Sequence, residues 1–453
     1  MIVMKFGGTS VQDAATMEQV ISIVKSKLSN RPIVVSSAMA HVTDTLIQIA
    51  QLARERNEAQ AEKLIEDALR KRHQEAIAQL IHDGTRRKLT QDALAKYLDE
   101  ITALVHGLAI LGELSPRSLD AMTSYGERLS TLILSAAMQE QGLNAELIDA
   151  RQIIITDDNH TRAAPLMEIS EARAKEILLP VVERGTVPVT QGFIGSTRDG
   201  VTSTLGRGGS DYSAALIGAL INAEVIEIWT DVDGILTADP KLIPQTRLLE
   251  TVTFQEASEL AYFGAKVLHP STILPAVERS IPVHVYNTKR PESPGTSIVS
   301  RESGKGQPGQ IKSIAYKRGI TVINVYSTRM LLAHGFLKSI FEVFDKFQTS
   351  VDLVSTSEVN VSLTIDDTRY LPAIVNELKK FSTVTVENGK AIICLVGEQM
   401  RYTPGLAARV FGAVRDLNVN MISQGASEIN LSFIVNEPDV LTVVQKLHHE
   451  FFE

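Results

Sequence analysis

A glycine-rich stretch, GRGGSD at residues 206–211, carries two opposite charges towards an expected helix. Arg207 offers a fork of N–H donors that fits a carboxylate or a phosphate through two hydrogen bonds at once. Asp211 falls in the first turn of that helix, where it could cap the helix or orient a neighbouring lysine. Glycine lets a backbone approach a ligand closely. Three glycines beside an arginine therefore favour a binding loop over a plain helix cap.

A second stretch of this kind, KFGGTS at residues 5–10, follows an expected strand and precedes a helix. The first N–H groups of a helix lack partners within the helix, and the helix dipole favours an anion there by ~0.3–1 kcal/mol. Lys5 would add a point charge suited to phosphate, with Gly7, Gly8 and Thr9 as a turn that could cap the helix. The alternative is a tight strand–helix turn with a surface lysine. No GxxxxGK[ST] motif occurs, and no GxGxxG follows this strand, so a nucleotide site would have another design.

Polar residues also follow a later apolar strand, in WTDVDGILTADPK at residues 229–241. A calcium loop that began at Asp231 would need a glutamate at its twelfth position, where Leu242 stands, so a calcium site is excluded. A polar turn or a nucleotide-facing loop remains, since α/β sheets bind ligands at the carboxyl ends of their strands. In FGAKVLHP, at residues 263–270, Lys266 taken alone predicts only a solvated surface lysine.

The composition limits the class of protein. The 453 residues are 44% hydrophobic and 22% charged, which is typical of soluble globular proteins with two to four domains. A net charge of -8 does not favour nucleic acid. The single cysteine, Cys394, excludes an internal disulfide and a cysteine-rich metal site. No stretch resembles a secretory signal or a membrane span, so we expect a cytoplasmic protein that does not bind membranes.

The order of the expected elements divides the chain. Strand and helix patterns alternate through the first 290 residues, which predicts an α/β fold with a mainly parallel sheet covered on both faces. Residues 51–122 interrupt this alternation with helical patterns only and indicate a helical insertion. Proline, glycine and serine gather between Lys289 and Gln310, which marks a linker.

An internal repeat follows the linker. Residues 335–365 and 405–435 match at a constant offset, with Gly335 and Phe341 each 70 positions before their counterparts. Each copy predicts a glycine turn, an amphipathic helix and two strands. Two copies are too few for a solenoid and indicate a pair of small α+β modules.

Taken together, KFGGTS, SYGERLST, GRGGSD, WTDVDG and FGAKVLHP resemble the aspartokinases of the amino-acid kinase superfamily, in the same order and over essentially the whole chain. The resemblance implies a three-layer αβα catalytic domain at residues 1–290, with the insertion at about 51–122, and a linker at 291–310. It also implies two ACT domains, at 311–385 and 386–453, of the kind that bind regulatory amino acids. A monofunctional enzyme is expected, without a fused homoserine dehydrogenase.

The resemblance implies the reaction of ATP with L-aspartate to give ADP and 4-phospho-L-aspartate. Lys5 would stabilise charge on the transferred phosphoryl group, and Asp211 would organise the catalytic centre. Aspartate would be bound by Arg207 through a carboxylate and by Glu127 of SYGERLST through the ammonium group, with Ser37, Thr43 and Ser210 lining its pocket. ATP would contact Lys5, Gly7, Gly8, Thr9, Thr230, Asp231, Leu236, Lys241 and Lys266.

These roles agree with the chemistry. A carboxylate is an adequate nucleophile at neutral pH, so catalysis needs alignment and neutralised charge rather than a general base. Mg²⁺ is expected on the ATP phosphates, and no metal site in the protein is expected. Two positions of the expected catalytic domain depart from the family: Leu236 replaces a frequent tyrosine near ATP, and His41 replaces a small residue, usually glycine. His41 either alters closure of the loop that carries Thr43 or is a tolerated surface change.

The first ACT domain is similar to that of the lysine-sensitive aspartokinases, which implies feedback inhibition by L-lysine and a homodimer formed through the ACT domains. Asp352 and Glu358 suit a ligand with two ammonium groups. Ala333 replaces a serine found in that subgroup. The expected lysine site comprises Met330, Ala333, Phe336, Leu337, Val351, Asp352, Ser357 and Glu358. Threonine, another amino acid, or no effector at all are the alternatives.

Two other interpretations of the whole chain stay open. One is a different kinase of the superfamily, acting on glutamate, acetylglutamate or UMP, which SYGERLST and FGAKVLHP disfavour. The other is a non-catalytic amino-acid sensor, which the presence of Lys5, Glu127, Arg207 and Asp211 disfavours.

Overall fold

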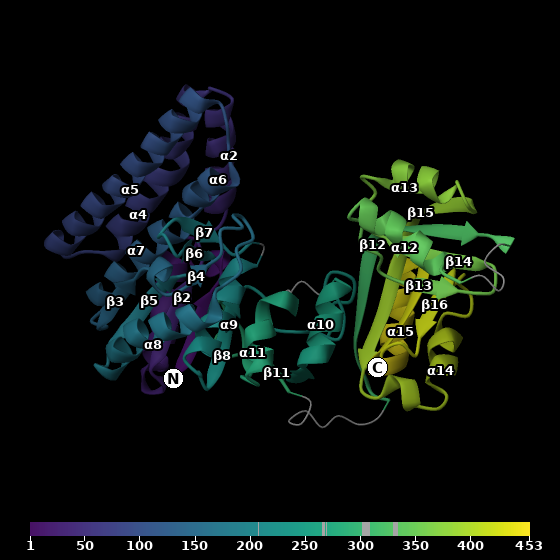
Figure 1. Cartoon of the computed structure of the whole chain (residues 1–453). Helices are drawn as coiled ribbons and strands as arrows, with labels where there is room; N and C mark the ends of the chain where they lie inside the picture. Colours follow the sequence, from purple (N-terminus) through teal and green to yellow (C-terminus); the bar gives the residue numbers. More distant parts are fainter. Residues whose placement is uncertain (207, 265–267, 269, 301–308, 329–333) are drawn as a thin grey trace. The chain divides into compact units, whose positions relative to one another are not determined.

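The computed structural model describes residues 1–206, 208–264, 268, 270–300, 309–328 and 334–453 (Figure 1). The chain forms two compact units, each described by itself below. The first unit comprises Met1–Ile235, Glu250–Phe254 and Val267–Gly304, and the second comprises Leu236–Leu249, Gln255–Lys266 and Lys305–Glu453.

An eight-stranded sheet forms the centre of the first unit, in the order β3-β5-β2-β1-β8-β10-β11-β9. The pairs from β3 to β10 are parallel, and only β11 runs antiparallel to its neighbour β10. The mainly parallel sheet predicted from the alternating pattern is therefore confirmed. The strands are β1 (Ile2–Phe6), β2 (Pro32–Ser36), β3 (Ala145–Ile148), β5 (Val187–Gln191), β8 (Val225–Thr230), β9 (Thr251–Thr253), β10 (Val283–Asn287) and β11 (Thr296–Val299).

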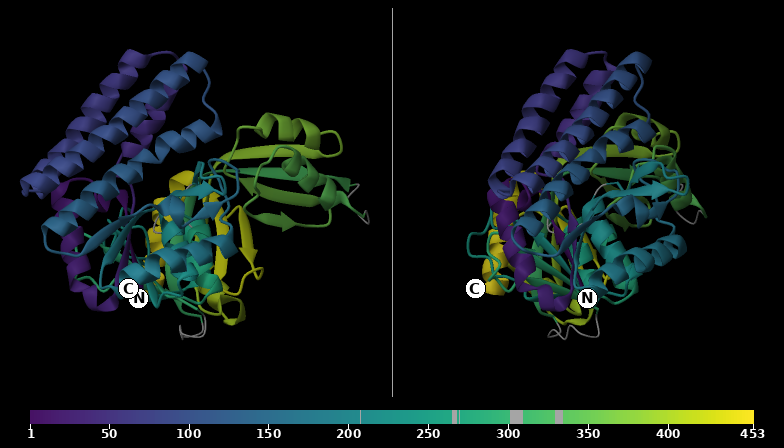
Figure 2. Two further views of the ribbon diagram at one scale, coloured as in Figure 1. Left: turned by 60° about the vertical axis from the view of Figure 1, so that its left-hand side comes forward. Right: turned by 90° about the vertical axis from the view of Figure 1, so that its left-hand side faces the viewer.

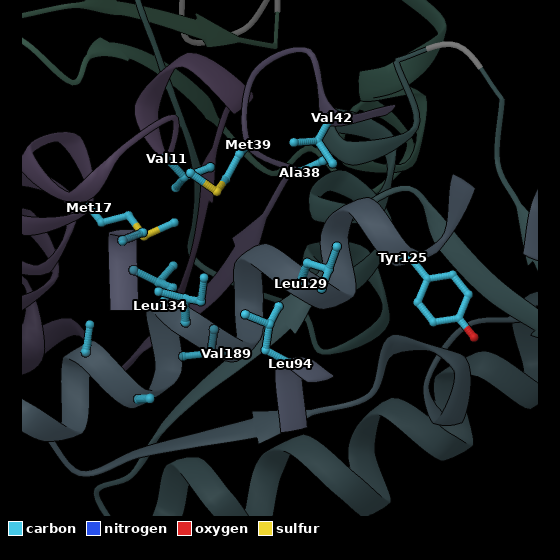
Figure 3. Close-up of a cluster of buried hydrophobic side chains, with 14 of the residues drawn as sticks. Val11, Met17, Ala38, Met39, Val42, Leu94, Tyr125, Leu129, Leu134 and Val189 are labelled. Carbon is cyan, nitrogen blue, oxygen red and sulfur yellow. The ribbon is translucent and has the colours of Figure 1, made fainter. Parts of the chain in front are cut away.

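Every residue of the central strands β1, β2 and β5 is buried, as is typical of a parallel sheet with helices on both faces. Helices α1 (Ala14–Ser26) and α7 (Tyr125–Glu140) pack on the face that presents Met4 and Phe6. Figure 3 shows this core, where Met17 of α1 and Leu129 and Leu134 of α7 lie close to Val189 of β5. Side chains alternate along a strand, so Lys5 points to the opposite face. That face is contacted by α9 (Gly209–Leu220), which packs beside α8 (Met167–Glu183) and α11 (Leu274–Glu278).

The residues between β2 and α7 are helical. They form α2 (Val42–Arg54), α3 (Glu58–Leu64), a π-helical stretch at Ile65–Arg70, α4 (Lys71–Leu80), α5 (Gly84–Leu111) and α6 (Pro116–Thr123). The long helices α4 and α5 run side by side (Figure 2). Apolar residues that recur along both helices, such as Ile77, Leu94 and Leu98, join the same core as α1 and α7. A small sheet of β4 (Ile155–Thr156), β6 (Ile194–Thr197) and β7 (Thr202–Thr204) completes the first unit.

The second unit contains one six-stranded antiparallel sheet, in the order β13-β14-β12-β15-β17-β16. Its two longest strands, β12 (Ile311–Tyr326) and β15 (Thr383–Gly397), pair in the centre along almost their full length. The start of β12 pairs with the end of β15, so each strand contributes to both repeats. Strand β15 also crosses the boundary expected at residues 385 and 386. The first repeat adds α12 (Phe336–Lys346), β13 (Val354–Thr356), β14 (Asn360–Ile365) and α13 (Leu371–Leu378), and the second adds α14 (Leu406–Ala413), β16 (Met421–Gln424), β17 (Asn430–Asn436) and α15 (Val440–Phe452).

Helix α10 (Phe254–Tyr262) begins at the last residue of the first unit's middle segment and continues in the second unit. Among the helices formed by described residues, none is both long enough and apolar enough to cross a membrane.

Candidate active site

A lysine–carboxylate pair lies where β1 and α9 meet. Lys5, the fourth residue of β1, places its Nζ 2.5 Å from Oδ1 of Asp211, in the first turn of α9. The Lys5 side chain is 9% exposed and that of Asp211 19%. Gly208 stands at the N-cap position of α9 and no side chain caps the helix, so Asp211 orients the lysine instead of capping. This resolves the two roles that the sequence left open for Asp211.

The turn after β1 is held by β8 and by the turn after β2. The Gly7 N–H donates to the carbonyl of Trp229, at 3.0 Å, and the Ala40 N–H donates to the carbonyl of Gly8, at 3.1 Å. A Cβ at Gly8 would lie 2.9 Å from the carbonyl oxygen of Ala38, so only glycine fits there.

The helix after this turn begins later than the sequence suggested. The turn at Gly7, Gly8 and Thr9 could have capped the helix, but Gly8–Ser10 is a short 3₁₀ turn and α1 begins at Ala14. Asp13 caps α1, because its carboxylate accepts a hydrogen bond from the Thr16 N–H at 2.9 Å. The Thr16 N–H in the first turn of α1 thus has a partner within the chain.

A cavity of about 550 Å³ opens beside the Lys5–Asp211 pair. Most of the residues expected to bind aspartate or the transferred phosphoryl group line it, namely Lys5, Ser37, Thr43, Glu127, Ser210 and Asp211. Arg207 lies outside the described residues. The structure therefore gathers residues from several separate stretches of the sequence around one space of the size of a small-molecule site.

Glu127 lies buried in the wall of this cavity, on the first turn of α7. Burial raises the pKa of its carboxyl group to about 8, against the opposing effects of a backbone hydrogen bond from Ala38 and of the Lys5 charge. Its Oε2 has no hydrogen-bond partner among the residues that the structure describes. A buried acceptor of this kind is costly unless a ligand satisfies it, so Glu127 suits a bound cationic group.

His41 has a left-handed backbone, with φ 68°, immediately before α2. Its side chain is exposed. The glycine that the resemblance implies at this position would adopt that φ without strain, which explains the family preference in backbone terms.

The sequence did not single out several residues of the cavity. Asp120, Thr123, Thr161, Phe193 and Thr204 also line it. They stand on α6, on β7 and in two loops, outside the glycine-rich stretches. Asp120 lies between Leu119 and Ala121, and a charge within an apolar helical pattern is the only local signal that could have indicated it.

A second cavity, of about 270 Å³, lies at the carboxyl ends of β1, β8 and β10. Thr9, Thr230 and Asp231, all expected to bind ATP, line it together with Thr288 and Lys289, which the sequence did not single out. The Ser10 and Thr288 hydroxyl groups, both in its wall, lie 2.7 Å apart. The position agrees with the general preference of α/β sheets for ligands at this edge.

The other expected ATP residues are placed differently. Leu236 and Lys241 belong to the second unit. The Leu236 carbonyl accepts a hydrogen bond from the Ser313 hydroxyl at 2.7 Å, and Lys241 is exposed. Lys266 lies outside the described residues.

The expected effector residues lie in the first repeat of the second unit. Phe336 and Leu337 begin α12, Val351 packs in the core of the repeat, and Ser357 and Glu358 are exposed in the turn after β13. Met330 and Ala333 lie outside the described residues.

Asp352 is the buried charge among the effector residues, with a side chain that is 2% exposed. Its Oδ1 accepts hydrogen bonds from the Tyr262 hydroxyl, at 2.5 Å, and from Lys317 Nζ, at 3.1 Å. Burial, together with the hydrogen bond to Asp352, raises the pKa of Tyr262. The Oδ2 atom of Asp352 has no partner among the described residues. Asp352 thus already holds one ammonium group of the chain and keeps one acceptor free.

The described residues contain no group of three or more His, Cys, Asp or Glu side chains that could hold a metal ion.

Comparison with known proteins identifies the family of the chain. Residues 1–287 match the model of the amino acid kinase family, and residues 393–451 match an ACT domain model. The lysine-sensitive aspartokinase 3 of Escherichia coli is 38% identical over 100% of this chain and 99% of its own length. Two solved structures of E. coli aspartokinase III, one with aspartate and ADP and one with lysine and aspartate, match 100% of both chains at 36% identity, with TM-scores of 0.84 and 0.82.

The fold and the site thus define an amino-acid kinase joined to a pair of ACT modules. Within that class, identity over the full length of its relatives shows that the chain belongs to the aspartokinase family.

Proposed function

We propose that this chain catalyses the transfer of the γ-phosphoryl group of ATP to the side-chain carboxylate of L-aspartate. The observation that carries the proposal is the meeting of the Lys5–Asp211 pair and the buried Glu127 around one cavity. A cation beside a carboxylate at the sheet edge suits phosphoryl transfer, and an unsatisfied buried acceptor suits the α-ammonium group of an amino acid.

Each proposed residue has its own role in substrate binding or phosphoryl transfer. Glu127 binds the ammonium group of aspartate, Arg207 binds its α-carboxylate, and Ser37, Thr43 and Ser210 line the pocket. An oxygen of the side-chain carboxylate attacks the γ-phosphorus while the bond to the β,γ-bridging oxygen breaks, which yields 4-phospho-L-aspartate and ADP. Lys5 neutralises charge on the phosphoryl oxygens, and Asp211 holds Lys5 in place. The carboxylate is already ionised, so no general base is needed.

The ATP site involves the turn after β1, with Gly7, Gly8 and Thr9, and the second cavity with Thr230 and Asp231. Leu236, Lys241 and Lys266 are proposed on the resemblance alone. Mg²⁺ usually binds through substrate phosphates and one or two carboxylates. Asp211 offers one such carboxylate beside Lys5, and the ion would supply further neutralisation of phosphate charge.

A substrate panel tests the proposal. ADP release should require L-aspartate and should stay at background with L-glutamate, N-acetyl-L-glutamate or UMP. Turnover with one of these and none with aspartate would assign another kinase of the superfamily. A folded protein with no turnover on any of them would indicate a sensor.

The raised pKa of Glu127 predicts a pH dependence of aspartate binding. In the free enzyme Glu127 is protonated below about pH 8, and it must ionise to pair with an ammonium group. Binding at pH 7 should therefore release about one proton, and affinity should rise up to about tenfold per pH unit below pH 8 before it levels off. Calorimetry in buffers of different ionisation enthalpy measures the proton count. A count of zero would contradict an ionised Glu127 in the complex.

We propose further that the ACT modules bind L-lysine as a feedback inhibitor and join two copies of the chain as a homodimer. Asp352 and Glu358 would pair with the two ammonium groups of the effector. The free Oδ2 of the buried Asp352 supports this assignment. The effector must bind the inhibited state more tightly than the active state, and a coupling of about 1–3 kcal/mol is typical.

Replacement of Asp352 by alanine should raise the lysine concentration for half-inhibition by about tenfold or more, since a coupling of this size depends on a few charged contacts. The kcat without lysine should stay close to that of the native enzyme. Asp366→Ala is the matched control, because Asp366 also pairs with Lys317, at 2.8 Å, but is not an expected lysine ligand. Equal inhibition curves for native enzyme and Asp352→Ala would overturn the assignment.

A further inference from the structure

Asp120 is a buried carboxylate in the wall of the larger cavity to which the reaction above gives no role. It lies on α6 with a side chain that is 1% exposed. A buried carboxylate is tolerated only where hydrogen bonds or opposite charges compensate the lost hydration. The hydrogen-bond partners of Asp120 therefore indicate which segments of the chain it positions.

Three groups donate to Asp120, and they come from two other segments. The Thr161 N–H donates to both oxygens, at 3.1 and 3.0 Å. The Thr204 hydroxyl donates to Oδ1 at 2.6 Å, and His160 Nδ1 lies 2.8 Å from Oδ2. A carboxylate can only accept, so this nitrogen of His160 carries the proton. Asp120 thus ties α6 to the loop at residues 157–164 and to the end of β7.

Both of these segments fix the entrance to GRGGSD. Thr204 is the last residue of β7, two positions before Gly206, and its carbonyl accepts a hydrogen bond from the Ala163 N–H at 2.9 Å. Gly206 has φ 80°, and a Cβ there would lie 3.1 Å from the carbonyl oxygen of Thr161. Gly206 therefore packs directly on Thr161, the residue whose N–H donates to Asp120.

The other side of the loop is packed just as closely. A Cβ at Gly209 would lie 2.6 Å from the ring of Phe193, and a Cβ at Gly192 would lie 2.7 Å from Cβ of Ser210. These contacts hold Gly209 and Ser210, at the start of α9, against Phe193 and Gly192.

We propose that Asp120 is a positioning residue for aspartate binding, which sets Gly206, at the entrance to the GRGGSD stretch, through Thr161 and Thr204. It acts on the substrate pocket and not on the ATP site, because Thr161 and Thr204 line the larger cavity and none of its partners lines the smaller one. The inference rests on the proposed function, since it needs aspartate as the ligand of that loop.

Asp120→Asn tests the inference. Asparagine keeps the shape of the side chain, but its N–H₂ group replaces one of the two oxygens that accept hydrogen bonds from Thr161, Thr204 and His160. The KM for aspartate should rise by about 10- to 100-fold, as expected when a binding group is displaced by about an ångström. The KM for ATP should change by less than about threefold, and the variant should unfold as one cooperative transition. Equal changes in both KM values, or no change in either, would overturn the proposal.

Two further sets of variants keep the test decisive. Thr204→Val should raise the KM for aspartate and Thr204→Ser should restore it, while Thr204→Val in the Asp120→Asn background should add little, because the two act as one unit. Full additivity would show that Thr204 does not act through Asp120. If Asp120→Asn fails to fold, His160→Ala removes a single donor and should still raise the KM for aspartate selectively.

Asp149→Asn is the control. It removes a carboxylate of the same unit that pairs with Arg151, at 2.6 Å, and lines neither cavity described above, so both KM values should stay at the native level. Native enzyme without aspartate-dependent turnover would refute the proposed function itself. Active native enzyme with an unaffected Asp120→Asn variant would refute only the role of Asp120.

Discussion

Lys5→Ala is expected to lower kcat by about 10²–10³-fold or more, with little change in the KM for aspartate, because a preorganised cation that faces the developing charge contributes mainly in the transition state. Lys5 is held for this role by the buried pair with Asp211 and by the strand that carries it. Steady-state kinetics with saturating ATP and aspartate measure the loss.

Loss of a buried ion pair could also lower activity by destabilising the fold, and Lys27→Ala controls for this. Lys27 pairs with the buried Glu227 at 2.9 Å in the same unit and lines neither cavity described above. Both variants should lose stability, but only Lys5→Ala should lose turnover. If Lys27→Ala lost as much kcat as Lys5→Ala, the effect would be one of stability and the catalytic role of Lys5 would be wrong.

Glu127→Gln should lower kcat/KM for aspartate by about 10²–10³-fold, since truncating one partner of a buried charged pair costs about 2–5 kcal/mol. The KM for ATP should change little. Glutamine keeps the size of the side chain and removes the negative charge, so a loss confined to aspartate would identify the ammonium partner. The proton release on binding expected for native enzyme should vanish in this variant.

The same substitution makes a prediction for stability. The folded chain holds the Glu127 proton more tightly than the unfolded chain, so the native protein loses stability as pH rises from about 4.5 to about 8. Glu127→Gln removes this loss. Its unfolding temperature should therefore depend less on pH in this range.

Glu100→Gln is the control for the kinetic effect of Glu127→Gln. Glu100 pairs with Tyr125 and Arg128 and lines neither described cavity, so the kinetics of Glu100→Gln should stay native. A native kcat/KM for Glu127→Gln would contradict the assignment.

The catalytic half of the chain is predictable from sequence because its signals are local. Apolar runs bounded by glycine identify β1, and the charges of KFGGTS and GRGGSD stand next to those runs. Lys5, in β1, and Asp211, in the first turn of the helix α9 that precedes β8, then meet in the structure. Lys5, Glu127 and Asp211 are recognisable from the sequence alone, whereas their distances and the pKa of Glu127 depend on the packing around them.

Other features depend on packing between distant segments. Asp120 is recognisable only once Thr161 and Thr204 are seen to donate to it. The start of α1 is ambiguous in the sequence because Thr9 and Asp13 are both good capping residues, and the structure shows that Asp13 caps the helix. The repeat indicates two modules, but the pairing of β12 with β15 that joins them follows from long-range register.

The most direct test of the account is to trap the acyl phosphate. Purified protein with ATP, Mg²⁺ and L-aspartate in the presence of hydroxylamine should form aspartyl hydroxamate, and millimolar L-lysine should suppress it. Hydroxamate formation that lysine does not lower would support the kinase activity and contradict the assignment of L-lysine as the inhibitor. No hydroxamate from a folded protein that still binds lysine would contradict the proposed reaction.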